Sequence, residues 1–211
     1  MAIAPGTTIL DYAVPARRTS RVASLGRDGL LIVSASILMA LAAHVGFYLP
    51  FTPVPITLQT FMVLLTGAAL GSKRGALVML LYIAEGAVGL PVFASGGSPA
   101  SLIGLTAGYI WAFPIAAFVV GWLCERGLDR SYLTSVFAML PAVVINLGLG
   151  VIWLAIFGLP MAHGVNHSLS ASLLAGAVPF LPGEAFKMVV AAALLPTAWA
   201  IVRRVRKEQE S

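Results

Sequence analysis

The feature that most constrains this chain is a series of long apolar runs separated by short clusters of arginine and lysine. A helix needs roughly 20 apolar residues to cross the hydrocarbon core of a bilayer. Six such runs can be placed, at residues 29–49, 56–72, 75–93, 107–124, 133–157 and 183–202. Only 10% of the residues are charged, whereas a soluble domain carries roughly 25%. The sequence therefore predicts an all-α integral membrane protein with six transmembrane helices.

The basic residues predict how these spans are oriented. Of the 13 Lys and Arg residues, 12 lie before residue 29, between runs two and three, between runs four and five, or after residue 202. These segments share one side of a six-span topology, and the positive-inside rule makes that side cytoplasmic. We expect residues 1–28 to form a cytoplasmic arm, 29–202 a transmembrane ligand-binding domain and 203–211 a basic cytoplasmic tail. The first run is expected to be retained as a span in the plasma (inner) membrane.

Composition argues against several other classes of protein. The net charge of +5 is compatible with nucleic-acid binding, but the cations lie in short clusters between apolar runs, so no nucleic-acid partner is expected. A single cysteine, Cys124, and the histidines His44, His163 and His167 do not form a metal set. No phosphate loop or nucleophile elbow is found. We therefore expect no enzyme, cofactor or metal, and any uphill transport needs an energy source on another subunit.

The thirteenth cation, Lys187, lies about one turn inside the last run, near its outer end. Glu184 precedes it by three residues, so both side chains share one helix face. A charge within a membrane helix costs at least a few kcal/mol unless it is paired or hydrated. The two residues either neutralise each other beside the outer headgroups or face a pocket. In a pocket, lysine would bind a ligand carboxylate and glutamate would accept N–H donors.

Further candidates for a ligand-binding site are Gln59, Glu85, Phe93, Tyr109 and the mid-span Asn146. All but Asn146 map to the outer half of their runs, which indicates a site loaded from outside the cell. Each also has a structural alternative. The polar groups can satisfy freed backbone or join helices, and the aromatic rings can belong to an interfacial belt.

Small residues recur along the first run at Ser36, Ala40 and Ala43. Small side chains at such spacing let helices approach closely. This face is a candidate for docking a partner subunit, although alanine-rich runs produce the same spacing by chance.

Four stretches of the sequence resemble the BioY family over roughly residues 30–200: FTPVPITLQTFMVLLTGAALG, RGALVMLLYIAEGAVGLPVFASGG, TAGYIWAFPIAAFVVGWLCERG and VPFLPGEAFKMVVAAALL. The PVPITLQ and GLPVFA blocks are distinctive. BioY proteins are biotin-specific substrate-capture (S) components of energy-coupling-factor (ECF) transporters. In this family the last helix usually begins P-G-D-x-x-K, so Glu184 replaces an aspartate while Lys187 matches.

The resemblance implies an S-component-like bundle that captures biotin on the outer side, with a transmembrane coupling subunit, an ATPase pair and membrane lipid as partners. It also implies that the first helix docks the coupling subunit, with Ser36 and Ala40 as the nearest matches. Three alternatives remain: an S-component for another small anionic vitamin, an intramembrane enzyme using Glu85 or Glu184, and a structural subunit without a ligand.

Overall fold

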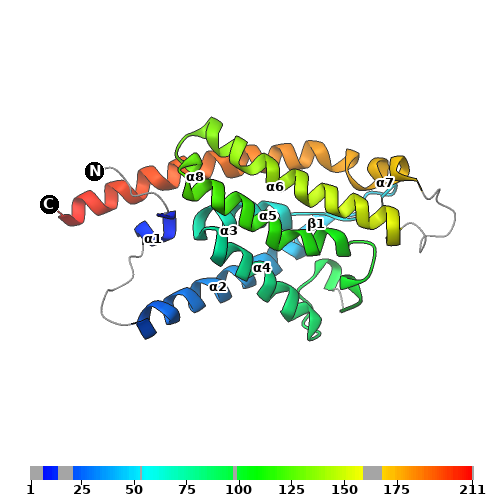
Figure 1. Cartoon of the computed structure of the whole chain (residues 1–211), viewed down its shortest axis with the longest axis horizontal. Helices are drawn as coiled ribbons and strands as arrows, with labels where there is room; N and C mark the ends of the chain where they lie inside the picture. The colour runs from blue at the N-terminus through cyan, green and yellow to red at the C-terminus, as the bar shows by residue number, and fades with distance from the viewer. Residues whose placement is uncertain (1–6, 14–20, 53, 97–98, 159–167, 211) are drawn as a thin grey trace.

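The computed structural model describes residues 7–13, 21–52, 54–96, 99–158 and 168–210 (Figure 1). The described chain is mostly helical, with one two-stranded antiparallel ribbon in which Gly46 pairs with Thr57. The α-helices and strands are α1 (Ile9–Ala13), α2 (Arg21–His44), β1 (Gly46–Phe47), β2 (Ile56–Thr57), α3 (Gln59–Leu70), α4 (Ser72–Ala87), α5 (Ala107–Glu125), α6 (Tyr132–Trp153), α7 (Leu169–Gly176) and α8 (Leu181–Glu210).

Four helical stretches within the described ranges are long and apolar enough to cross a membrane: Val22–His44, Ala107–Glu125, Tyr132–Phe157 and Leu169–Val205. The second and third predicted spans correspond to shorter helices, because α3 has 12 residues and α4 has 16. The apolar runs at 56–72 and 75–93 include residues that form β2 and the loop after α4, so hydropathy overestimated the length of both helices.

Two predicted boundaries fall inside continuous helices. Helix α2 begins at Arg21 rather than at residue 29, and α8 continues through the basic tail to Glu210. Arginine, lysine and glutamate are good helix formers, and nothing in these segments forces the helix to break. Hydropathy marks where the chain leaves the lipid, and the helices extend beyond that point.

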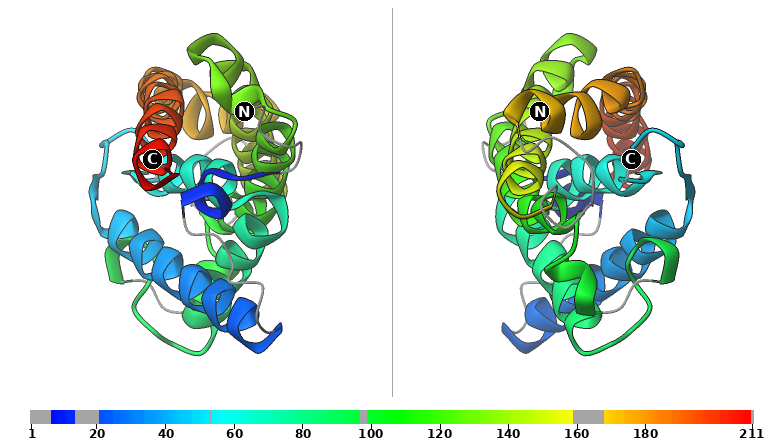
Figure 2. Two further views of the ribbon diagram at one scale, coloured as in Figure 1. Left: turned by 90° about the vertical axis from the view of Figure 1, so that its left-hand side faces the viewer. Right: turned by 90° about the vertical axis from the view of Figure 1, so that its right-hand side faces the viewer.

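Helix α5 is the centre of the bundle and packs against α3, α4 and α6. Helix α3 contacts α2 as well as α8, which lie on opposite sides of it (Figure 2). The approach of α3 to α5 depends on Gly67, because a Cβ at this position would collide with the Ala117 carbonyl oxygen and the Val120 side chain. Small residues therefore permit close helix packing here, as is usual in membrane bundles.

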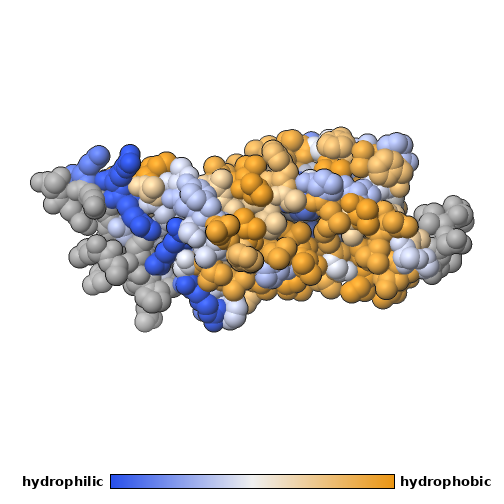
Figure 3. Space-filling model, turned by 90° about the horizontal axis from the view of Figure 1, so that it is seen from above, coloured by the Kyte–Doolittle hydropathy of each residue, from blue (hydrophilic) through white to orange (hydrophobic). Residues whose placement is uncertain are grey.

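The surface is divided into an apolar body and a hydrophilic end. Figure 3 shows an apolar surface over much of the face in view, with hydrophilic side chains gathered at the end where α8 finishes. Large apolar residues such as Leu30, Ile37, Ile115, Phe137 and Val144 are exposed on this body. An exposed apolar surface of this extent is expected where lipid, rather than water, is the solvent.

The hydrophilic end, which we call the charged end, contains α1, the start of α2 and the start of α4. Asp11 on α1 accepts hydrogen bonds from Arg27 at 3.1 Å and from Arg74 at 2.8 Å. Arg74 also lies 3.2 Å from Asp28. Burial raises the pKa of Asp11, but hydrogen bonds from Thr8, Arg74 and Arg27 outweigh it and hold the pKa below its ordinary value. These charges bind α1 to the ends of α2 and α4.

An aromatic contact also holds the charged end against α8. Tyr12 of α1 lies 5.7 Å from Trp199, measured between ring centroids. The Trp199 Nε1 donates a hydrogen bond of 2.5 Å to the buried Asp129, in the turn between α5 and α6. Burial raises the pKa of Asp129. Residues 9–13 of the predicted arm are therefore an integral part of the packed structure.

Candidate functional site

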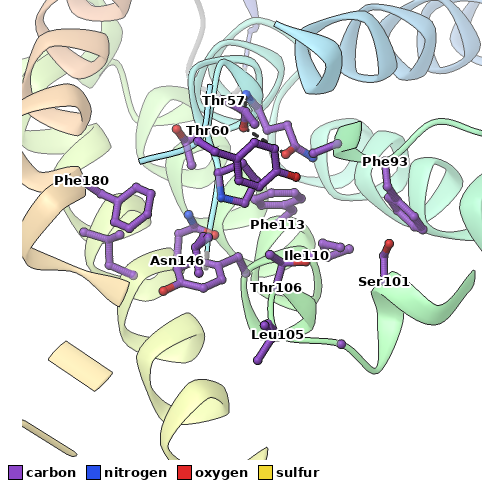
Figure 4. Close-up of a pocket in the computed structure, with 18 of the residues that line it drawn as sticks. Thr57, Thr60, Phe93, Ser101, Leu105, Thr106, Ile110, Phe113, Asn146 and Phe180 are labelled. Carbon is purple, nitrogen blue, oxygen red and sulfur yellow. Dashed lines mark hydrogen bonds between the residues drawn. The ribbon is translucent and has the colours of Figure 1, made fainter. Parts of the chain in front are cut away.

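A cavity of about 420 Å³ lies where α3, α5 and α8 begin, away from the charged end. Figure 4 shows residues that line it. Its walls come from α3, α5, α6, the start of α8 and the loop that follows α4. Polar side chains on the walls are Thr57, Gln59, Thr60, Ser101, Thr106, Asn146, Glu184 and Lys187, and the aromatic ones include Phe93, Tyr109, Phe113 and Phe180. An apolar cavity with a few convergent polar groups is typical of a site for a small ligand.

Lys187 and Glu184 meet Thr60 in a compact network on one wall. The Lys187 Nζ donates to Glu184 Oε1 at 2.6 Å and to Thr60 Oγ1 at 2.8 Å. The Thr60 hydroxyl donates in turn to Glu184 Oε1 at 2.8 Å. Glu184 is 4% exposed and Lys187 7%. Helices α3 and α8 therefore bring their first turns together, which is where the positive end of a helix dipole favours a carboxylate.

Two buried acceptor atoms on the cavity wall lack a hydrogen-bond donor. They are Oε2 of Glu184 and Oδ1 of Asn146. A buried acceptor without a partner costs about 1–3 kcal/mol. Such groups are uncommon in folded proteins and call for an explanation. Both atoms would be satisfied by a ligand that presents N–H groups.

Gln59 lines the cavity but its side chain is also held by the chain itself. Its Nε2 donates to the Tyr82 hydroxyl at 2.8 Å, and its Oε1 accepts from Thr57 at 3.0 Å. Tyr82 donates to the Val92 carbonyl oxygen at 3.0 Å and contacts the Phe93 ring edge-on. Gln59 therefore braces the wall that carries Phe93, with one amide hydrogen left for a ligand.

Tyr109 contributes its ring to the cavity, while its hydroxyl points elsewhere. The hydroxyl donates to the Gly176 carbonyl oxygen at 2.6 Å. The ring lies 6.5 Å from that of Phe180, measured between centroids. Tyr109 thus ties the end of α7 to α5 and supplies an apolar surface on which a flat ligand can pack.

Glu85 is a correction to the predicted site, because it does not line the cavity. Its Oε2 accepts a hydrogen bond of 2.5 Å from Ser36, so the carboxylate joins α4 to α2. Depth along the helix was right, but the direction in which the side chain leaves α4 was not available from sequence. Glu85 therefore joins two helices, which was the structural alternative given for it above.

The residues of the predicted docking face on α2 are mostly buried within the chain. Ser36 and Ala43 are 0% and 2% exposed, and Ala40 is partly buried. Helix α2 packs on α4 and α3, and Ser36 bonds Glu85 of α4. The exposed face of α2 carries large apolar residues, among them Val33 and Leu41. Docking of a partner on the small residues of α2 stays a prediction.

Sequence reasoning missed Thr60, Phe113 and Phe180 as cavity residues. A hydroxyl next to Gln59 at the start of an apolar helix was the available signal for Thr60. The two phenylalanines gave none, since single aromatic residues are common throughout the apolar runs. Of the histidines, His163 and His167 lie outside the described residues, and His44 is discussed below.

The sequence model of the BioY family matches residues 16–204 of this chain. The chain belongs to the BioY family. It is 38% identical over 165 residues to the biotin transporter BioY of Thermotoga maritima, covering 76% of this chain and 90% of that protein. It is 34% identical over 168 residues to the biotin transporter BioY of Rhizobium etli, covering 78% and 88%.

A solved structure resembles this BioY chain throughout its length. It is the crystal structure, at 2.1 Å, of the S-component for biotin from an ECF-type ABC transporter. The two chains are 26% identical, with a TM-score of 0.71 covering 90% of this chain and 95% of that one. With its apolar helices and this family membership, the protein is a multi-pass protein of the plasma membrane.

Proposed function

We propose that this protein captures biotin in the cavity at the outer side of the membrane and takes part in its uptake. The observation that carries the proposal is the pair of buried acceptors, Glu184 Oε2 and Asn146 Oδ1, beside the Lys187 ammonium. The bicyclic head of biotin presents two ureido N–H donors and one carbonyl oxygen. The donors match the two acceptors, and the carbonyl can accept from the ammonium.

The Lys187 ammonium has a hydrogen to spare for this role. It carries three N–H donors, of which one goes to Glu184 and one to Thr60. The remaining one can reach the ureido carbonyl oxygen. The rings of Phe93, Tyr109, Phe113 and Phe180 then enclose the apolar parts of the head. Every polar atom of the head has a partner in this arrangement, which is the condition for burying it at low cost.

The charge balance of the site changes the role that we assigned to Lys187 from the sequence. We expected Lys187 to bind a ligand carboxylate, but its charge is already neutralised by Glu184 at 2.6 Å. A second carboxylate would leave a net negative charge in a buried, low-dielectric site, which is strongly unfavourable. A neutral head group keeps the site neutral. We therefore propose that the ureido ring, and not the carboxylate, binds at Lys187.

The proposed topology has six spans with both termini in the cytoplasm. Helices α3 and α4 are short, but Arg74 at the start of α4 binds Asp11 and Asp28 at the charged end. The turn between α3 and α4 therefore lies at the same end as both described termini (Figure 1). At the opposite end of the bundle, the first residues of α3 and the loop that follows α4 line the cavity, as expected if both helices cross the membrane. The basic residues of the charged end favour the cytoplasm for that side.

We further propose that separate subunits energise the release of biotin inward. The ECF name of the structural relative indicates a coupling subunit and an ATPase pair as partners. The transported ligand is changed in position and not in chemistry, so no cofactor is required for capture. An S-component for another small anionic vitamin remains the alternative function.

The test is equilibrium binding of radiolabelled biotin to the purified protein, with unlabelled vitamins as competitors. We expect saturable binding near one biotin per chain, displaced by unlabelled biotin and not by thiamine, riboflavin or pantothenate. Mass spectrometry of the ligand that copurifies with the protein gives an independent answer. Absence of saturable biotin binding, or stronger displacement by another vitamin, would refute the proposal.

A further inference from the structure

A second cavity, of about 260 Å³, adjoins the first at its mouth. We call it the annex. The two cavities share Tyr48, Pro55, Thr57 and Ala94 on their walls, so they are neighbouring parts of one hollow. The annex is formed by the end of α2, the β1–β2 ribbon and the segment after Phe93, and its remaining lining residues are Ala43, His44, Gly46 and Gly96.

His44 is the group in the annex that can interact with an anion. Its Nδ1 lies 2.8 Å from the Ala40 carbonyl oxygen, which can only accept, so Nδ1 carries a hydrogen. The other ring nitrogen, Nε2, gains a hydrogen when the imidazole becomes cationic. Among the described residues that line the two cavities, only Lys187 and His44 have side chains able to carry positive charge.

The two cations are not equivalent. Lys187 is buried and already neutralised by Glu184. His44 is exposed at the end of α2, where water still solvates part of a bound anion. An anion therefore loses less hydration at His44 than it would at the buried Lys187. The other titratable side chains that line the two cavities are Tyr48 and Tyr109. Glu85 on α4 is bonded to Ser36 and lines neither cavity.

We propose that the annex is the binding site for the carboxylate of the ligand's aliphatic tail, with His44 as its cationic partner. The proposal rests on the function proposed above, which places the neutral ureido head at Lys187. The valeryl tail of biotin can then extend along the shared wall at Tyr48 and Thr57, which joins the main cavity to the annex. The arrangement separates recognition of the neutral head from recognition of the charged tail.

The test compares biotin with its methyl ester, which keeps the head and tail but lacks the negative charge. Affinities for both are measured by titration calorimetry for the wild type, His44→Ala, His44→Arg and the control Leu41→Ala. Leu41 is an exposed residue of α2 that lines neither cavity. Because exposed ion pairs contribute little, we expect the wild type to prefer the acid by about three- to five-fold.

His44→Ala should abolish this preference, with little change in the affinity for the ester. His44→Arg, which restores a positive charge, should keep it, and Leu41→Ala should match the wild type. The proposal is overturned if the His44→Ala protein keeps the wild-type preference, if it loses affinity for both ligands equally, or if the wild type shows no preference. A wild type that binds neither ligand would instead refute biotin capture itself.

Discussion

The two ends of the molecule treat their charged groups in different ways. At the charged end, Asp11 is bonded to two arginines and to Thr8. At the cavity, Glu184 shares one oxygen with Lys187 and Thr60 and leaves the other without a donor. Buried atoms without a hydrogen-bond partner also occur at the charged end, among them Arg27 Nε, Asp28 Oδ1 and Asp129 Oδ1, but these residues line neither cavity.

This difference indicates what each end contributes. Ion pairs within the chain hold α1, α2 and α4 together. Acceptors on a cavity wall that no donor of the chain reaches can accept hydrogen bonds from a bound ligand. Substitutions at the charged end should therefore change stability and leave affinity intact, and substitutions at the cavity should do the reverse.

The largest effect is expected for Lys187→Met. Loss of the ammonium removes a charged hydrogen bond to the ligand, worth about 1.5–3 kcal/mol, and leaves Glu184 buried without its partner. We expect biotin affinity to fall by roughly 100-fold in a filter-binding assay. The control is Lys73→Met, at an exposed position at the charged end. Wild-type affinity in the Lys187 variant would remove this residue from the site.

Asp11→Asn should lower the stability of the protein and leave its affinity for biotin unchanged. It breaks the bonds to Arg27 and Arg74, and we expect a loss of about 1–2 kcal/mol, since both pairs are only partly buried. The measurement is the thermal midpoint of unfolding in detergent, together with biotin affinity, which should not change. A fall in affinity with an unchanged midpoint would break the distinction between the two ends.

The stability that Asp11 contributes in the wild type should depend on pH in the acid range. The pKa of Asp11 is below its ordinary value in the folded protein, so the folded state binds this proton less readily than the unfolded state. The stability from Asp11 is complete above the ordinary aspartate pKa of about 4. It is lost as the pH falls through the lower folded-state pKa. Asp11→Asn should lack this component when midpoints are compared between pH 5 and pH 3.

Thr60→Val should produce a smaller loss at the cavity. Valine keeps the shape of the side chain but removes the hydroxyl that joins Lys187 to Glu184. Because the hydroxyl acts on the ligand only through Lys187 and Glu184, we expect a loss of about 1 kcal/mol in binding, which is a roughly five-fold fall in biotin affinity. Thr60→Ser should be close to wild type. If Thr60→Ser is as weak as Thr60→Val, the hydroxyl is not the group that matters.

The smallest effect on binding is expected for Glu85→Gln. The side chain bonds Ser36 and lines neither cavity, and glutamine can preserve that bond. We expect biotin affinity within two-fold of wild type, whereas Glu184→Gln, the matched change in the cavity, should weaken it by roughly ten-fold. Equal losses in both variants would restore Glu85 to the site.

Some parts of this molecule were predictable because they depend on local composition. The apolar runs predicted helices and their order, and Glu184 and Lys187 were identified as neighbours from their spacing on one helix. Other contacts could not be predicted from the sequence, for a common reason. The sequence shows that Ser36 and Glu85 are polar groups at membrane depth, but they lie on different helices. Only the packing of α2 on α4 shows that they bond to each other.

The sequence by itself determined that this chain is a helical membrane protein with its positive charges gathered at one end. Transfer from water to lipid depends on the length and polarity of each segment, and both can be read along the chain. Only the tertiary structure decided that Thr60 joins the Glu184–Lys187 pair, that Asn146 faces the same cavity and that Glu85 does not. Those contacts depend on the rotation and approach of separate helices, which side-chain packing sets across the whole bundle.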